Sequence, residues 1–407
     1  MSGGLPPASP WRYPVLVSGD TATSLRDLRP RIAATYERVR ILEVPVVAAR
    51  TFAELVGKSG GAAGFSAEPT IRRGPAPLAN AWGAGASSWL RDAAERVRGT
   101  NPDMSASIIH SLDAHLSGRP NEWQCGRHSL STRDRPLVMG ILNVTPDSFS
   151  DAGQYLDPGR AEEIACSMVE DGADIVDVGG ESTRPGSAPI GAEEEIARII
   201  PVLKRLAGKL TVPISVDTYR ASVARAALDH GASVINDITA LGGDREMLPL
   251  LQSTEAGIVL MHMQGTPATM QARPHYTDLV AEIYLFLHSR VRDCVRAGIA
   301  PCRICVDPGI GFGKTIRHNL DLLRRTGEFT SLGLPVMIGP SRKGFIGDIL
   351  NQPVSRRLEG TIAASVIACM GGAAVLRVHD VGPVVRAVRV AAAVMDSSTF
   401  ADRERSE

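Results

Sequence analysis

Residues 157–179, DPGRAEEIACSMVEDGADIVDVG, combine a helical pattern with a short apolar run. In the helical part, apolar and glutamate side chains fall on opposite faces of a helix. Asp157 and Pro158 are a typical N-cap and first helical residue, and Gly172 is a typical helix stop. The run that follows, Ala173–Gly179, is apolar at nearly every position, as expected for a parallel strand buried on both faces. The stretch therefore predicts one amphipathic helix followed by one buried strand.

The same unit recurs along the chain from Arg135 to Val394. Each β-branched run is followed by a turn and then by a helical pattern, and the runs are Leu137–Val144, Ala173–Gly179, Pro213–Asp217, Ser233–Ile238, Gly257–Met263, Ile304–Asp307, Pro335–Ile338 and Ala374–His379. Strands that alternate with helices favour a parallel sheet. Eight units in about 260 residues favour an α/β fold closed into a (β/α)₈ TIM barrel over an open, doubly wound sheet.

Residues 1–120 follow a different pattern and contain no chemical motif. They hold apolar runs, a flexible stretch and two helical segments, at Val15–Val17, Ile41–Val47, Ser59–Gly64, Ser87–Arg98 and Met104–Leu116. We interpret them as a small α+β extension of unknown role before a barrel domain at residues 121–395. Within that domain, residues 123–130 are expected to form a hairpin at the bottom of the barrel, and residues 396–407 form a polar tail.

The composition excludes several classes of partner. The 407 residues carry 44 basic and 44 acidic side chains, so no overall charge directs the chain to nucleic acid or an anionic membrane. Six cysteines in this length do not suggest a disulfide framework. The first twenty residues lack the pattern of a signal peptide, and no apolar run is long enough to span a membrane. We expect a cytoplasmic protein.

Polar residues concentrate where the predicted strands end. They are Asn143, Asp147, Asp177, Glu181, Ser182, Thr183, Arg184, Asp217, Asn236, Asp237, His262, Gln264, Asp307, Ser341, Arg342, Lys343, Arg377 and His379. The carboxyl ends of all strands of a barrel open on one face, where active sites lie. This set therefore predicts an active site at that face.

The residue types at these strand ends narrow the ligand. A carboxylate can accept two parallel hydrogen bonds from a guanidine-like edge, which suits Asp217, Asn236 and Asp307 to a flat heterocycle. Positive charge suited to phosphate oxygens is expected from Arg184, Lys343, Arg377 and His379. The sequence thus predicts a site for a polar ring that carries a phosphate or diphosphate. His262 either contacts this ligand or supports the rim through hydrogen bonds.

The motifs at the strand ends resemble those of dihydropteroate synthases, in the order of that family. The two longest are Asn143–Asp151, NVTPDSFSD, and Asp177–Gly186, DVGGESTRPG. The others are Ser215–Asp217, Ile235–Asp237, Met261–Gly265, Asp307–Lys314, Ser341–Lys343 and Arg377–His379. The resemblance covers the whole predicted barrel. It departs from the family at Gly344, where serine is common, and at Ala240-Leu241.

The resemblance implies the activity and a role for each site residue. A dihydropteroate synthase condenses a (7,8-dihydropterin-6-yl)methyl diphosphate with p-aminobenzoate to give 7,8-dihydropteroate and pyrophosphate in folate biosynthesis. The pterin ring would be held by Asp217, Asn236, Asp307 and Lys343, of which Asp217, Asp307 and Lys343 would act in catalysis. The diphosphate would be held by Asn143, Arg377 and His379. Two loops, carrying Thr145-Pro146-Asp147 and Ser182-Thr183-Arg184-Pro185, would close over the site. Together with Phe312 and Ser341 they would form the p-aminobenzoate pocket.

The resemblance also implies a cofactor and an oligomeric state. Asn143 would contribute to a Mg²⁺ site, because Mg²⁺ commonly keeps waters and takes other ligands from substrate phosphates. A homodimer packed through the later helices is expected.

Two other functions share part of this pattern. Pterin-dependent methyltransferases have the same barrel and ring-binding carboxylates, but they have no diphosphate to hold. An inactive pterin-binding paralogue would have lost anion-binding residues, and here they are all present. A third pattern, Gly309–Thr315, approaches a nucleotide phosphate loop, but Pro308 stands where such a loop needs glycine.

Overall fold

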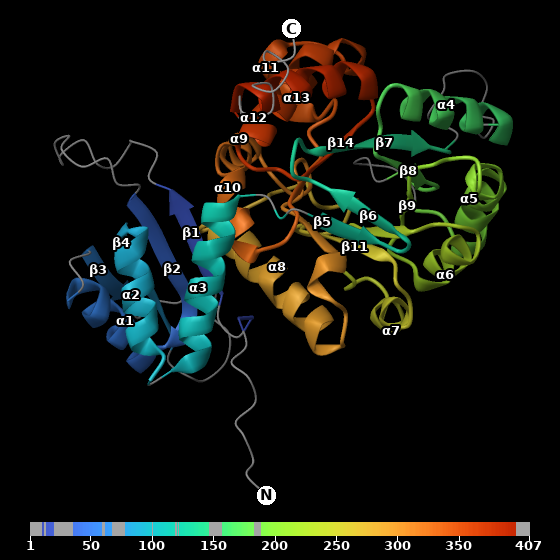
Figure 1. Ribbon diagram of the computed structural model, residues 1–407. Helices are drawn as coiled ribbons and strands as arrows, with labels where there is room; N and C mark the ends of the chain where they lie inside the picture. Colours follow the sequence, from blue (N-terminus) through green and yellow to red (C-terminus); the bar gives the residue numbers. More distant parts are fainter. Residues whose placement is uncertain are drawn as a thin grey trace, which may run out of the picture. The chain divides into compact units, whose positions relative to one another are not determined.

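The computed structural model in Figure 1 describes most of the chain, with several gaps. The described residues are 10–11, 14–19, 36–58, 62–66, 78–99, 101–118, 120, 122–145, 157–182 and 189–395. The chain forms two compact units. The first comprises residues 1–118, 276–292 and 327–333, and the second comprises residues 119–275, 293–326 and 334–407. The predicted polar tail, residues 396–407, lies outside the described residues.

The second unit contains an eight-stranded parallel barrel. Its strands are β7 (Leu137–Asn143), β8 (Ile175–Gly179), β9 (Ile214–Asp217), β10 (Val234–Asp237), β11 (Gly257–Met261), β12 (Ile304–Asp307), β13 (Met337–Ile338) and β14 (Val375–Val378). They are hydrogen-bonded in the order β12-β11-β10-β9-β8-β7-β14-β13. A parallel bridge between Val306 and Val336 joins the two ends of this order. The predicted (β/α)₈ barrel is confirmed, with every predicted run supplying one strand.

Helices lie outside these strands (Figure 1). They are α4 (Pro158–Glu170), α5 (Ala192–Leu206), α6 (Ala221–Asp229), α7 (Met247–Gln252), α9 (Ile316–Arg324), α11 (Gly344–Leu350), α12 (Leu358–Met370) and α13 (Val381–Met395). Two further helices, α8 (Leu279–Arg296) and α10 (Thr326–Phe329), are divided between the two units. Helix α4 begins as the sequence predicts, because the Asp157 side chain accepts a hydrogen bond from the Arg160 amide and Pro158 is the first helical residue.

The bottom of the barrel is closed by a hairpin formed by β5 (Glu122–Cys125) and β6 (His128–Ser131). The Trp123 ring is fully buried and donates its indole N–H to the Arg303 carbonyl oxygen at 3.1 Å. Trp123 and Cys125 pack in one apolar cluster with residues from the barrel strands, including Met139 and Val259. The predicted hairpin is therefore present, and its core packing lies at the end of the barrel away from the polar strand ends.

The first unit contains an antiparallel sheet and three helices. The sheet has the order β1-β2-β4-β3, with β1 (Val15–Gly19), β2 (Tyr36–Pro45), β3 (Ala62–Ser66) and β4 (Leu78–Ala86). The helices are α1 (Val46–Lys58), α2 (Ser87–Val97) and α3 (Pro102–Ser117). The predicted α+β character is confirmed. Part of the stretch predicted as flexible, Ala62–Gly64, belongs instead to β3, because its backbone pairs with β4.

The first unit also includes the beginning of α8. The Tyr284 hydroxyl, on α8, donates a hydrogen bond to the Val15 carbonyl oxygen at 2.6 Å. Arg40 of β2 forms an ion pair of 2.8 Å with Asp278, just before α8. The N-terminal segment is therefore packed together with residues that come much later in the chain.

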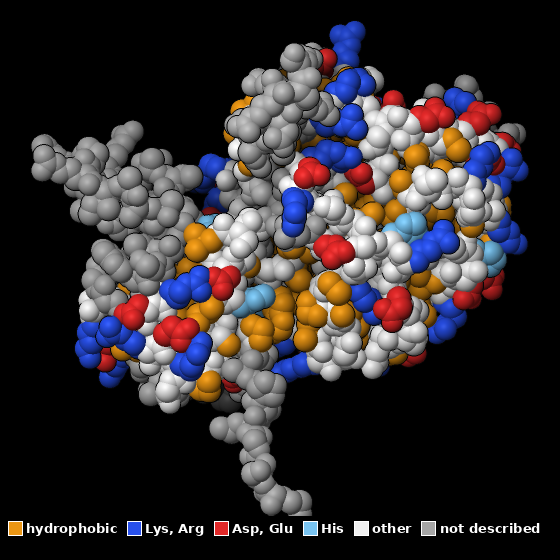
Figure 2. Space-filling model, in the orientation of Figure 1, with side chains coloured by type: hydrophobic (Ala, Val, Ile, Leu, Met, Phe, Trp, Pro, Cys, Tyr) orange, Lys and Arg blue, Asp and Glu red, His pale blue; other side chains and the backbone are white. Residues whose placement is uncertain are grey.

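Neither sign of charge predominates among the described residues on the face drawn in Figure 2. On the face drawn in Figure 2, Lys and Arg side chains are intermixed with Asp and Glu, in keeping with equal numbers of both in the sequence. Among the described residues, no helix combines the length and the apolar character needed to cross a membrane.

Candidate active site

An arginine joins the ends of three barrel strands. Arg377 of β14 donates from Nε to Asp177 Oδ2 of β8 at 2.6 Å and from Nη2 to Asp217 Oδ2 of β9 at 2.7 Å. Asn236 of β10 donates from Nδ2 to the same Asp177 oxygen at 3.2 Å. The pattern of strand ends in the sequence correctly predicts that Asp217, Asn236 and Arg377 meet at one mouth.

This cluster is charged and largely buried. Asp177 is fully buried, and Asn236 is only 3% exposed. Burial raises the pKa of the Asp217 carboxyl, and the neighbouring Arg377 guanidinium opposes this shift. A guanidinium has five N–H donors, and among the described residues Arg377 makes two such bonds, which leaves three donors that a ligand could use. The cluster can thus accept hydrogen bonds from a ring and donate them to an anion.

A second group lies at the end of β12. Asp307 is 4% exposed, and its Oδ1 accepts a hydrogen bond from the Gly309 amide at 2.6 Å. Burial raises the pKa of Asp307 to about 6. The Lys343 Nζ lies 4.2 Å from the centre of the Phe312 ring. Burial, together with the nearby Arg377 charge, lowers the pKa of Lys343 to about 8. Asp307, Phe312 and Lys343 therefore form one wall of charged and aromatic groups.

His379 and Ser341 are linked to each other. The Ser341 Oγ lies 3.0 Å from His379 Nδ1 and accepts the His379 backbone N–H at 3.1 Å. Burial and the nearby Arg377 charge lower the pKa of His379 to about 3. In the ligand-free protein this lowered pKa favours a neutral imidazole near pH 7, and the positive charge expected of His379 beside a bound diphosphate stays a prediction. The neutral ring can still donate one N–H to an anion.

Asn143 ends β7, and its Oδ1 lies 3.4 Å from the position that a Cβ on Gly179 would occupy. Among the described residues, no group of three or more His, Cys, Asp or Glu side chains is placed to hold a metal ion. The protein groups therefore fit a Mg²⁺ ion only if most of its ligands come from water and a substrate diphosphate.

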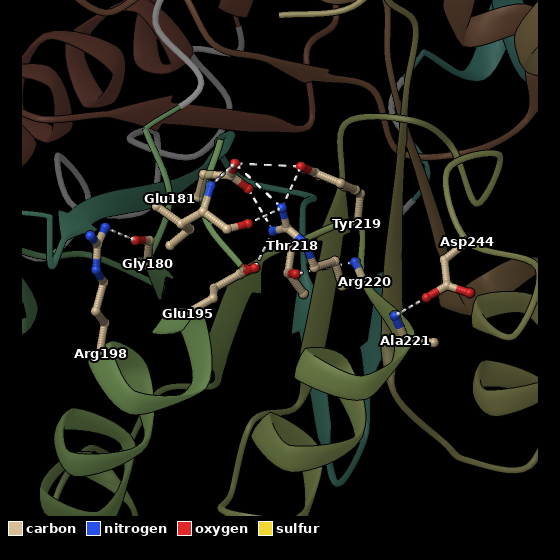
Figure 3. A network of polar contacts seen from close by, with 10 residues as sticks. Gly180, Glu181, Glu195, Arg198, Thr218, Tyr219, Arg220, Ala221 and Asp244 are labelled. Atoms are coloured by element: carbon tan, nitrogen blue, oxygen red, sulfur yellow. Dashed lines mark hydrogen bonds and ion pairs between the residues drawn. The ribbon is translucent and has the colours of Figure 1, made fainter. Parts of the chain in front are cut away.

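A polar network lies behind the ends of β8 and β9 (Figure 3). Arg220 donates to Glu181 Oε2 at 2.6 Å and to the Ile190 carbonyl oxygen at 2.7 Å, and it also contacts Glu195. Glu181 in turn accepts the Ile190 amide at 3.2 Å. Arg220 and Glu181 thus tie Ile190 to the end of β8.

The remaining predicted site residues are not among those that the structure describes, and one residue of the Arg377 cluster was not predicted as a site residue. Thr183, Arg184 and Pro185, like Asp147, lie outside the described residues. Asp177 was noted at a strand end but not assigned to the site. The structure shows that it bonds both Asn236 and Arg377. Its place two residues before Gly179-Gly180, near a strand end, was the signal available in the sequence.

The comparison with protein families agrees with this arrangement. The sequence model of the family described as pterin binding enzyme matches residues 139–379. The chain is 47% identical over 262 residues to the dihydropteroate synthase of Escherichia coli (strain K12), a match that spans 64% of this chain and 93% of that protein. It is 46% identical over 261 residues to the dihydropteroate synthase of Synechocystis sp., spanning 64% and 90%.

Solved structures give the same result. The dihydropteroate synthase of Xanthomonas albilineans with 4-aminobenzoic acid superposes with a TM-score of 0.64 at 42% identity, covering 68% of this chain and 99% of that one. The Burkholderia cenocepacia enzyme complexed with 7,8-dihydropteroate superposes with a TM-score of 0.62 at 39% identity, covering 69% and 98%. We conclude that this chain belongs to the dihydropteroate synthase family of pterin-binding enzymes.

Proposed function

We propose that this protein is a dihydropteroate synthase, which condenses (7,8-dihydropterin-6-yl)methyl diphosphate with p-aminobenzoate and releases pyrophosphate. The observation that carries the proposal is the Arg377 cluster. Among the described residues, the Arg377 guanidinium is bonded to the carboxylates of Asp177 and Asp217. It keeps three N–H donors at the mouth of the barrel. Such a group can hold a diphosphate beside carboxylates that hold a ring.

The ring-binding groups follow from their charges. An ionised Asp307 can accept hydrogen bonds from the amino group and a ring N–H of a pterin, and such charge-assisted pairs are the stronger hydrogen bonds. Asp217 and Asn236 offer further acceptors in the same mouth. Lys343 can donate to the pterin carbonyl oxygen or a ring nitrogen. These four groups would orient the pterin methylene toward the second substrate.

The diphosphate would be held by Arg377, His379 and Asn143. Mg²⁺, when bound with Asn143 and the diphosphate oxygens, would neutralise charge on the leaving group. Departure of the diphosphate leaves positive charge on the pterin methylene, which the carboxylates of Asp217 and Asp307 stabilise. The amine of p-aminobenzoate is neutral and already nucleophilic, so its attack needs no strong base.

The reaction itself provides the first test. The protein, supplied with both substrates and Mg²⁺, should release one pyrophosphate for each dihydropteroate formed. Omission of p-aminobenzoate should stop the coupled release. Methyl transfer from a methylated pterin, without pyrophosphate release, would favour the methyltransferase alternative, and binding of pterin without turnover would favour the inactive paralogue.

The anion-binding role of Arg377 gives a second test. Arg377→Ala removes a cation that only the pterin diphosphate would contact, so its affinity should fall far more than that of p-aminobenzoate. Separate calorimetric titrations measure both affinities. Equal losses for the two substrates would contradict this role, and Arg377→Lys, which keeps the charge but not the fork geometry, is the matched control.

The proposal includes a homodimer. Exposed apolar side chains are present on α12 and α13, which pack against each other, and they are Ile367, Met370, Val390, Val394 and Met395. A contiguous exposed apolar surface commonly marks an interface. Sedimentation should give a dimer mass for the wild type and a monomer for Ile367→Glu combined with Val390→Glu. A wild-type monomer at assay concentration would contradict this part of the proposal.

A further inference from the structure

A buried lysine lies behind the wall formed by Asp307, Phe312 and Lys343. Lys314 is only 3% exposed, although its side chain ends in an ammonium group. Its Nζ lies 2.9 Å from the Phe312 carbonyl oxygen, 3.2 Å from His262 Nδ1 and 3.4 Å from the His262 carbonyl oxygen. Among the described residues, no carboxylate lies within ion-pair distance of it. An ammonium has three N–H donors, and these three acceptors match that number.

The three contacts join two strand ends. His262 directly follows β11, and Phe312 lies in the loop after β12. The His262 amide also donates to the Asp307 carbonyl oxygen at 2.9 Å. Burial lowers the pKa of His262 well below its ordinary value, so the neutral ring can accept at Nδ1. His262 thus supports the rim, which was one of the two roles left open by the sequence.

The loop is shaped closely around Lys314. Gly309 has a positive φ of 75°, and a Cβ there would lie 2.0 Å from the His262 carbonyl oxygen and 3.3 Å from Lys314 Nζ. Gly311 has a φ of 84°, and a Cβ there would lie 2.9 Å from Lys343 Cδ. Only glycine fits such close contacts in this backbone conformation. The backbone at Gly309 therefore passes close to Lys314, and the backbone at Gly311 passes close to Lys343.

We propose that Lys314 is a positioning residue for the reaction, fixing the loop 309–312 that aligns Asp307, Phe312 and Lys343. Lys314 donates a hydrogen bond to the Phe312 carbonyl oxygen, and the Lys343 ammonium lies over the Phe312 ring. In the same loop, the Gly309 amide donates to the Asp307 carboxylate. Burial lowers the pKa of Lys314 to about 7, and the Asp307 charge opposes this shift. This role rests on the proposed function and deepens it.

The test replaces Lys314 by a side chain of similar length that cannot donate. Lys314→Met should weaken the calorimetric affinity for a pterin ligand by about tenfold or more, because the Phe312 and His262 carbonyls lose their donor. The KM for pterin diphosphate should rise in parallel. Lys209→Met is the matched control, since Lys209 is exposed and pairs with Glu162 on the outer surface. It should leave both values unchanged.

A double-mutant cycle separates positioning from a purely structural role. Phe312→Ala keeps the carbonyl that Lys314 contacts but removes the ring on which the Lys343 ammonium lies. If Lys314 acts by positioning this ring, then in a Phe312→Ala background the Lys314→Met change should weaken pterin affinity by less than about threefold. Additive losses, or wild-type affinity in Lys314→Met, would overturn the proposal. If Lys314→Met does not fold, Lys314→Gln, which keeps an amide donor, is judged by the same cycle. Failure of both variants to fold would also overturn it in favour of a folding role.

Failure of the proposed role of Lys314 can be distinguished from failure of the proposed synthase activity. The unchanged protein is assayed first for pyrophosphate release, and its failure there would reject the synthase activity itself. An active wild type with normal affinity in Lys314→Met would reject only the role of Lys314.

Discussion

At the scale of single residues, the site depends on carboxylates that the fold makes expensive to ionise. Burial raises the pKa of Asp307 to about 6, although the Gly309 amide and the charges of Lys343 and Lys314 oppose this shift. When ionised, a buried carboxylate accepts strong hydrogen bonds from a ligand's N–H groups, but its burial lowers the stability of the ligand-free protein. Perturbed pKa values of this kind are typical of functional sites.

Replacement of Asp307 by Asn tests this balance. The amide presents a donor where the pterin edge also donates, so pterin affinity should fall by about 2–5 kcal/mol. The Asn oxygen can still accept the Gly309 amide, and the variant no longer buries a charge. Its melting temperature at pH 8 should therefore equal or exceed that of the wild type. Near-normal pterin affinity with lowered stability would instead assign Asp307 a purely structural role.

The pH dependence of pterin affinity gives a related prediction. Because the ionised carboxylate accepts the ring donors, affinity should be full above Asp307's pKa of about 6 and fall as the pH drops through it. Stability should change in the opposite direction. A raised pKa destabilises the folded state at neutral pH, and this penalty disappears as the pH falls from about 6 toward the ordinary value of 3.8. Asp217, whose pKa is also raised, should account for the pH dependence that remains in Asp307→Asn.

At the scale of elements, ion pairs fix how chain segments leave the strand ends. The Arg220 network joins the end of β8, the start of α5 and the residue Ile190 through one guanidinium (Figure 3). Glu195 on α5 is 1% exposed, and burial raises its pKa. Arg220 thus neutralises two carboxylates of which one is fully enclosed.

Removal of Arg220 should therefore strongly destabilise the protein. Arg220→Met leaves Glu181 and Glu195 without their cation, and breaking one side of a buried ion pair typically costs about 3–5 kcal/mol. Chemical denaturation measures this loss. Arg160→Met is the matched control because its pair with Glu163 is exposed and contributes at most about 1 kcal/mol. Similar small losses in both variants would show that the Arg220 network is well solvated.

At the scale of the whole molecule, the N-terminal segment is packed with parts of the chain that follow the first barrel strands. Tyr284 is buried and bonds Val15, and the Trp11 ring lies 4.9 Å from the ring of His110 and 6.3 Å from that of His288. Because residues 1–120 contain no chemical motif, we expect a chain starting near Asn121 to keep measurable activity if it stays soluble. The contacts of Tyr284 and His288 now point to a structural cost of that truncation.

The chain beginning at Asn121 should be markedly less stable than the full chain, because the truncation exposes the apolar side of α8 to water. Thermal unfolding of the two proteins measures the difference. Tyr284→Phe in the full chain is a milder companion change, expected to cost about 1 kcal/mol for the lost hydrogen bond. A truncated protein with unchanged melting temperature would show that the extension does not stabilise α8.

The sequence by itself determined the elements and the face of the molecule where the chemistry lies. Repeated apolar runs specify buried parallel strands, and strand direction alone brings Asp217, Asn236, Asp307 and Arg377 to one mouth. Cap residues such as Asp157 act locally and were equally readable. Only the tertiary structure decided which side chains pair and how burial shifts their pKa values. The bonds from Arg377 to Asp177, the lowered pKa of His379 and the burial of the Lys314 side chain depend on distances across the barrel and on burial. These quantities arise from packing between residues far apart in the chain, so no local pattern encodes them.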